Sequence, residues 1–126
     1  MEFKELKDKG GKLYQMLILR SEEMPEKDLA YSSPKIWEEM VVAEKYNNDK
    51  NLDLPADLKQ FREALNDVKK FMNGALMKLF QKGQSILDAG ALKQIEIYMI
   101  NIHTAKNSEE LYNIIASVLD LTEHLQ

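Results

Sequence analysis

The segment that decides the fold is Ala56–Lys82, ADLKQFREALNDVKKFMNGALMKLFQK. Its hydrophobic residues recur at alternating steps of three and four, the spacing that places side chains on one face of an α-helix. The members of this stripe are Leu58, Phe61, Leu65, Val68, Met72, Ala75 and Leu79. Further apolar residues widen the stripe to an arc of about 180°, at about 100° per residue. Such a wide arc predicts a central helix that contacts several others.

A shorter stripe of the same period occurs near the start of the chain. It predicts a helix that ends near Glu23 and begins at Phe3 or, if the glycines Gly10–Gly11 fray its start, at Lys12. Each glycine inside a helix costs about 1 kcal/mol relative to alanine. The sequence therefore favours fraying over the alternative, in which the two glycines let another helix approach closely.

A second helix is expected between these two segments. Two prolines bracket a connection, Glu26–Ser33, that is expected to hold at most one helical turn. Ser33 as the N-cap and Pro34 at the first helical position are typical of a helix start. The helix is expected to end in the polar run Asn47–Asn51, which predicts a loop. The long third helix then ends at Gly83.

The last two helices have recognisable start signals. Ser85 or Asp88 is expected to open the fourth helix, and Asn107 or Ser108 to cap the fifth. The residues Ile95–Tyr98 alternate and favour a strand locally. A lone strand without a partner strand would leave its backbone groups unsatisfied, so the prediction here is a helix.

These segments predict an all-α fold, a compact and mostly antiparallel four- to five-helix bundle. The short connections favour antiparallel packing of neighbours, and 126 residues suit a single domain over 1–126. The side chains expected in the interior are Trp37, Leu58, Phe61, Leu65, Val68, Met72, Leu79, Leu92, Ile95, Met99, Ile114 and Val118.

Composition excludes several classes of function. The chain has no cysteine, which excludes disulfides and thiol chemistry and suits a reducing compartment, so we expect a cytoplasmic protein. Its 17 basic and 21 acidic residues are interspersed and sum to −4, unlike the basic surface of a nucleic-acid-binding domain. The apolar run Met16–Leu19 is too short to span a membrane, and the first residues lack the apolar region of a signal peptide.

No arrangement of reactive residues indicates an enzyme. The only histidines, His103 and His124, are expected to be ordinary surface residues. No Glu-x-x-His pair is present, and Glu96 with His103 supplies two metal ligands where a site needs three or more. The sequence therefore predicts no catalytic residues, no metal site and no cofactor.

Five hydrophobic residues lie at the edge of the helical stripes or outside them. They are Leu19, Met77, Phe80, Ile97 and Ile100. For Met77 the sequence favours packing under a neighbouring loop, and for the two isoleucines it favours burial between adjacent helices. The alternative is that these side chains are exposed together as an interface, a role that flexible methionine suits well.

The function predicted from these residues is binding rather than catalysis. We expect a protein partner, or self-association as a homodimer, at an apolar helix face, in an adaptor, inhibitor, chaperone or immunity-type role. A second hypothesis is a bundle that binds a small hydrophobic ligand. The residues that would line its cavity are Trp37, Met40, Phe71, Met72 and Met99. A third, an enzyme that uses acidic residues, would need two carboxylates in one deep pocket.

Overall fold

The computed structural model describes residues 1–22, 26–50 and 55–125, and side chains within the last two ranges at 35–49 and 58–125. Every regular element in this part of the chain is an α-helix. The elements are α1 Phe3–Ser21, α2 Glu26–Lys50, α3 Pro55–Gly83, α4 Ala89–Thr104 and α5 Ser108–Leu121. The predicted all-α bundle is confirmed, and the segment around Ile95–Tyr98 is helical.

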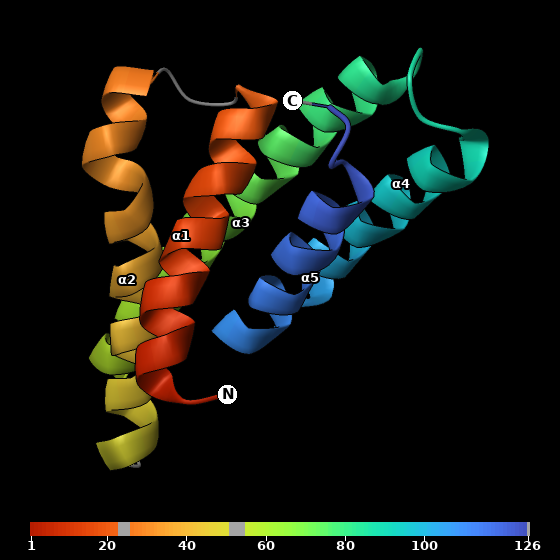
Figure 1. Cartoon of the computed structure of the whole chain (residues 1–126). Helices are drawn as coiled ribbons and strands as arrows, with labels where there is room; N and C mark the ends of the chain where they lie inside the picture. Colours follow the sequence, from red (N-terminus) through yellow and green to blue (C-terminus); the bar gives the residue numbers. More distant parts are fainter. Residues whose placement is uncertain (23–25, 51–54, 126) are drawn as a thin grey trace.

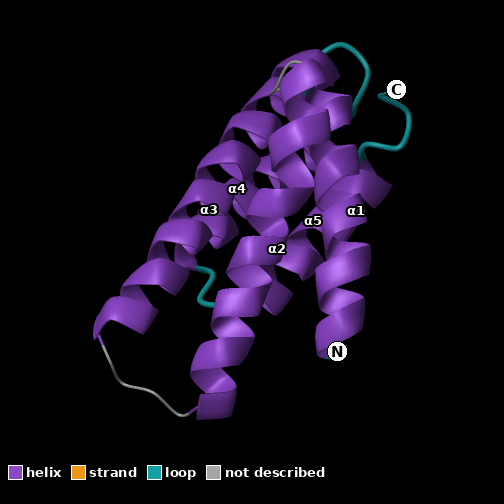
Figure 2. Ribbon diagram, turned by 90° about the vertical axis from the view of Figure 1, so that its left-hand side faces the viewer, coloured by secondary structure: helices purple, strands orange, loops and turns teal. Residues whose placement is uncertain are grey.

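Each helix runs antiparallel to the one before it (Figure 1). α1 packs most extensively against α2, and α5 packs against α1 and α4. α3 contacts α1, α2 and α4, which confirms that a helix with such a wide apolar arc touches several others; α1 likewise contacts three helices, α2, α3 and α5. Figure 2 shows that α2 and α3 extend at one end beyond α5. α4 is an outer helix, in contact mainly with α3 and α5.

The seam between α1 and α2 is built on a glycine. α1 is regular from Phe3, so the expected fraying at Gly10 is wrong. A Cβ on Gly10 would lie 2.6 Å from Nε1 of Trp37, because the indole ring lies directly on the α1 backbone. Trp37 Nε1 donates a hydrogen bond of 3.0 Å to the carbonyl of Leu6, and the Trp37 ring stacks on Tyr14 at 5.8 Å. Gly10 therefore admits the largest side chain of the core.

α2 is longer at both ends than the sequence predicts. The helix begins at Glu26 and runs through Ser33 and Pro34, so the expected connection and helix start there are wrong. Proline inside a helix removes one hydrogen bond and crowds the carbonyl four residues earlier, a cost that the packing of α2 against α1, α3 and α5 can offset. The expected loop is also wrong over 47–50, because α2 ends at Lys50; residue 51 lies outside the described residues.

The helix starts after the long α3 follow local rules. α3 ends at Gly83 as predicted. Asp88 caps α4 by accepting a hydrogen bond of 2.7 Å from the backbone N–H of Ala91. Asn107 caps α5 by accepting one of 2.9 Å from the N–H of Glu110. Of the paired candidates for each cap, the structure selects Asp88 and Asn107.

A side chain from α2 completes the start of α5. The Glu44 carboxylate accepts hydrogen bonds from the backbone N–H of Ser108 at 3.0 Å and from its hydroxyl at 2.7 Å. A carboxylate is favourable at the positive end of a helix. Ser108 is fully buried, so this contact satisfies polar groups that burial removes from water.

The core matches the predicted list in most positions. The predicted residues that are buried are Trp37, Leu65, Val68, Met72, Leu79, Ile95, Ile114 and Val118. Leu58, Phe61, Leu92 and Met99 are half-buried. The predicted core includes no residue of α1, although Tyr14, Leu17 and Ile18 of that helix are fully buried.

Candidate functional site on the outer face of α3 and α4

The structure exposes four of the five hydrophobic residues that the sequence singles out. The exposed fraction is 46% for Leu19, 52% for Met77, 39% for Ile97 and 64% for Ile100. Phe80 is half-buried and packs against the core. Burial of Met77 under a loop and of Ile97 and Ile100 between helices, which the sequence favours, is therefore wrong.

The exposure of Ile97 and Ile100 follows from the position of α4 in the bundle. The buried residues of α4 are Ile95 and Ile102. At about 100° per residue, Ile97 and Ile100 lie about 200° and 140° around the helix from Ile95, on the opposite side. Because α4 packs mainly on α3 and α5, no described helix covers that outer side.

A polar contact fixes how α3 and α4 are aligned. Nδ2 of Asn73 lies 3.2 Å from Nε2 of His103, and Nζ of Lys69 donates to the His103 carbonyl at 3.2 Å. Met77 is four residues after Asn73, about 6 Å along α3, and Ile100 is three residues before His103, about 4.5 Å along α4. Since the helices are antiparallel, Met77 and Ile100 lie at nearly the same level.

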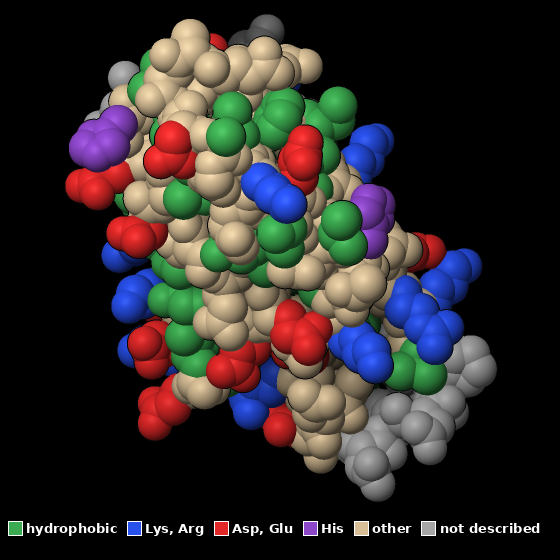
Figure 3. Space-filling model, turned by 90° about the vertical axis from the view of Figure 1, so that its right-hand side faces the viewer, with side chains coloured by type: hydrophobic (Ala, Val, Ile, Leu, Met, Phe, Trp, Pro, Cys, Tyr) green, Lys and Arg blue, Asp and Glu red, His purple; other side chains and the backbone are tan. Residues whose placement is uncertain are grey.

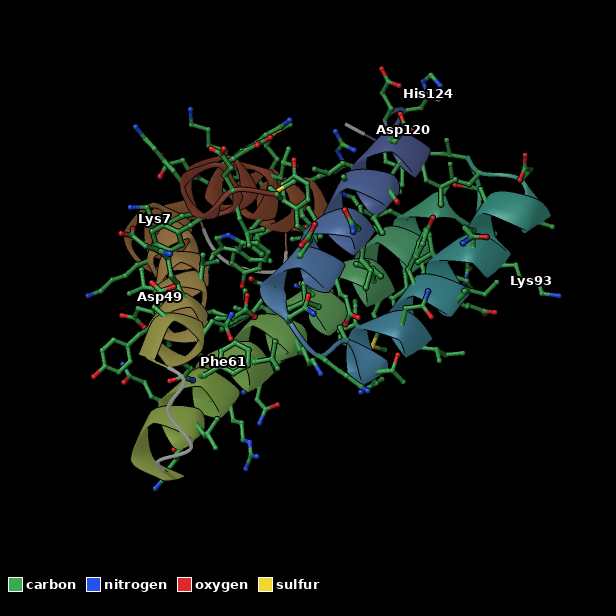
Figure 4. All side chains as sticks on the ribbon, turned by 90° about the horizontal axis from the view of Figure 1, so that it is seen from below. Lys7, Asp49, Phe61, Lys93, Asp120 and His124 are labelled. Carbon is green, nitrogen blue, oxygen red and sulfur yellow. The ribbon has the colours of Figure 1, made fainter. Side chains whose placement is uncertain are left out.

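Met77, Ile97 and Ile100 form one group, which we name the α3–α4 patch. Its rim is polar and carries both signs of charge. Helical spacing places these exposed or half-buried residues around the patch: Lys70, Asn73, Gln81, Lys93, Glu96, Asn101, His103 and Thr104. Figure 3 shows the side of the molecule formed largely by α4 and α5, where hydrophobic side chains reach the surface between isolated charged groups. In Figure 4, Lys93 extends from α4 away from the bundle.

Two predicted residues do not join this patch. Leu19 lies on α1, which packs against α2, α3 and α5 rather than against α4. Phe80 is on the side of α3 that turns toward α4 and contacts the core. The candidate site is therefore smaller than the predicted set of five.

Lys69, Asn73 and His103 form a polar cluster beside the patch that sequence reasoning missed. Burial lowers the pKa of the Lys69 ammonium below its ordinary value of 10.5, and the Glu110 carboxylate opposes part of that shift. Among the described residues, Oδ1 of Asn73 is buried and has no hydrogen-bond partner. The spacing of Lys69 and Asn73, four apart on one helix, is the only sequence signal of this cluster.

A second surface feature lies on α2. An open groove is lined by Lys35, Glu38, Glu39, Val42, Ala43, Tyr46, Asn47 and Gln60. Val42 and Tyr46 are exposed and four residues apart on α2. The same spacing in the sequence marks them as neighbours on one helix face.

The side chains proposed to line a ligand cavity lie in the packed interior. Trp37, Met40 and Met72 have no exposed surface. Phe71 and Met99 are half-buried and pack against the same core. A ligand at this position would have to displace side chains that already fill the space between the helices.

The described residues contain no group of three or more His, Cys, Asp or Glu side chains placed to hold a metal ion. Within the same part of the chain, no helix combines the length and the apolar character that crossing a membrane requires. His103 and His124 are exposed, as predicted.

Comparisons with known proteins return no match. No family model, no curated protein and no solved structure is similar to this chain. The function is therefore inferred from the chain's own geometry.

Proposed function

We propose that this protein acts by binding another protein molecule through the α3–α4 patch, without catalysing a reaction. The observation that carries the proposal is the exposure, at one level of the bundle, of Met77 from α3 beside Ile97 and Ile100 from α4. Single exposed hydrophobic residues are ordinary on protein surfaces, whereas several that adjoin mark an interface.

The composition of α4 supports the proposal. Within its 16 residues, the outer helix α4 carries Lys93 and Glu96 as its only Lys, Arg, Asp or Glu residues. α1, which also has a face turned to solvent, carries seven such residues in 19. Depletion of charged residues at the centre is characteristic of protein–protein interfaces. A partner that covers α4 would explain this difference.

The class of partner follows from charge. With a net charge of −4, the chain lacks the excess of basic residues that phosphate contacts require, which favours a protein partner over a nucleic acid. The absence of cysteine agrees with action in the reducing cytoplasm, where we propose that the protein works.

The test compares one patch variant with one matched control. Wild type, Ile100→Lys and Leu19→Lys are used as tagged baits in extract of the native host, and bound proteins are quantified by mass spectrometry. Ile100 and Leu19 are both exposed hydrophobic residues in helices, but only Ile100 lies in the patch. We expect Ile100→Lys to reduce capture of the specific partner at least about tenfold, and Leu19→Lys to leave it unchanged.

Thermal unfolding of the three baits is measured alongside. Equal melting temperatures show that the loss of capture does not come from unfolding. Retention of every partner by Ile100→Lys would contradict the proposal, as would early melting of that variant, which would make Ile100 a core residue.

A further inference from the structure

We infer that the partner of the α3–α4 patch is a second copy of this chain, bound about a two-fold axis that places α4 antiparallel over α4 and α3 over α3. The inference rests on the proposed function, because it uses the same patch as the docking surface. A two-fold interface brings one surface against an identical surface, so that surface must be complementary to itself.

The outer strip of α4 is self-complementary about a point midway between Ile97 and Ile100. With the axis at this point, Ile97 faces Ile100 of the second copy and Ile100 faces Ile97. Four residues farther out, Lys93 faces Thr104.

The outer strip of α3 has the same property about Met77. In an antiparallel arrangement Met77 faces its own copy.

A single two-fold axis requires that Met77 on α3 and the midpoint between Ile97 and Ile100 on α4 lie at the same height along the bundle, and they do. The Asn73–His103 contact of 3.2 Å provides the common reference. From Asn73 to Met77 is four residues, about 6 Å along α3. From His103 to the point between Ile97 and Ile100 is four and a half residues, about 7 Å along α4 in the same direction. The two levels differ by about 1 Å, so a single axis serves both helices.

Charge favours this direction over the parallel one. A parallel pairing would place Lys93 over Lys93, Glu96 over Glu96 and Lys70 over Lys70. Like charges that face each other across an interface oppose association. In the antiparallel pairing Lys93 faces the uncharged side chain of Thr104.

The size of the face predicts a weak dimer. The 16 residues of α4 extend about 24 Å, and two adjacent helices are about 20 Å wide. Their footprint is about 480 Å² on each copy, or about 1,000 Å² in total, at the lower limit for a specific interface. The dimer is expected to dissociate on dilution through micromolar concentrations, on the order of 1–100 μM.

Sedimentation velocity of the purified chain, from about 1 μM to about 1 mM, measures this equilibrium. Wild type is expected to shift from monomer to dimer across the series. Ile100→Lys is expected to raise the dissociation constant at least about tenfold. Leu19→Lys, with the same change on α1, is expected to dimerise like wild type.

Single cysteines test the direction of pairing, because the chain has none of its own. A disulfide requires two Cα atoms within about 7 Å. Met77→Cys, on the axis, is expected to form a disulfide-linked dimer on mild oxidation. Lys93→Cys is expected not to do so alone, because its copy lies about 16 Å away along α4. Mixed with Thr104→Cys, it is expected to form the mixed dimer.

Three results would overturn the inference: a monomer at every concentration, a dimer that Ile100→Lys does not weaken, or a disulfide of Lys93→Cys with itself. A monomer would leave the proposed function standing if Ile100→Lys still lost a partner in the extract. Loss of dimerisation by Ile100→Lys together with unchanged capture of other proteins in the extract would support the dimer as the function of the patch.

Discussion

The seam between α1 and α2 and the outer face of α3 and α4 depart from simple helical patterning in opposite ways. At the seam, Gly10 is a residue that disfavours a helix, yet it lies in the middle of one. At the outer face, Ile97 and Ile100 are hydrophobic residues exposed to solvent. Gly10 is explained by Trp37, which fills the space that a side chain would occupy. Ile97 and Ile100 have no such counterpart among the described residues. The comparison shows that a departure from the pattern indicates a contact, and that the contact can lie within the chain or beyond it.

The largest expected effect tests whether the two regions differ in what they contribute to folding. Trp37→Ala removes the largest buried side chain and its hydrogen bond to the Leu6 carbonyl, and is expected to lower the free energy of unfolding by about 3–5 kcal/mol. Ile100→Ala is expected to change it by no more than about 0.5 kcal/mol, since the side chain is exposed. Urea denaturation at protein concentrations below the micromolar range, where the chain is expected to be monomeric, measures the free energy of unfolding of both variants. Similar losses of unfolding free energy in Trp37→Ala and Ile100→Ala would show that the seam and the outer face contribute equally to folding.

A smaller effect tests the contact at the seam itself. Gly10→Ala would place Cβ 2.6 Å from Trp37 Nε1, so the buried indole must move. The expected net loss of stability is about 1–3 kcal/mol, although alanine favours a helix by about 1 kcal/mol over glycine. At Gly11 the new Cβ would lie 3.7 Å from Trp37 Cδ1, an ordinary contact.

Gly11→Ala is therefore the matched control, and it is expected to gain up to about 1 kcal/mol from helix propensity. Thermal and urea unfolding of the two variants give opposite signs if the Gly10–Trp37 contact is as tight as the structure shows. A gain in stability from Gly10→Ala would show that the seam has room for a side chain.

The same division explains which parts of the fold could be predicted from the sequence. The stripe through Leu65, Val68 and Met72 depends only on spacing within one helix, and it correctly predicted a helix that contacts several others. The caps at Asp88 and Asn107 depend on the next three residues and were among the predicted candidates. Features whose cause lies within a few residues are accessible to sequence reasoning.

The errors have causes that are distant in sequence. Gly10 indicated fraying because its partner, Trp37, is 27 residues away on another helix. Pro34 indicated a helix start, although α2 runs through it and packs on α1 and α3. The spacing of Ile97 and Ile100 established that they lie off the stripe. It could not establish whether a neighbouring helix covers them, because that depends on where α4 lies in the bundle.

The smallest expected effect concerns Lys69, at the edge of the outer face. Burial lowers its pKa below 10.5 in the folded protein, so just below pH 10.5 the unfolded chain binds more protons than the folded one. The stability of wild type should therefore rise with pH through this window, relative to Lys69→Met, whose side chain does not titrate. Because the group is near solvent, the rise should be small.

Glu110→Gln removes the carboxylate that raises this pKa, and should lower the Lys69 pKa further. Heteronuclear NMR titration of the lysine side chains measures the shift directly. A Lys69 pKa equal to that of the exposed lysines would show that this edge of the α3–α4 face is as open to water as the patch beside it.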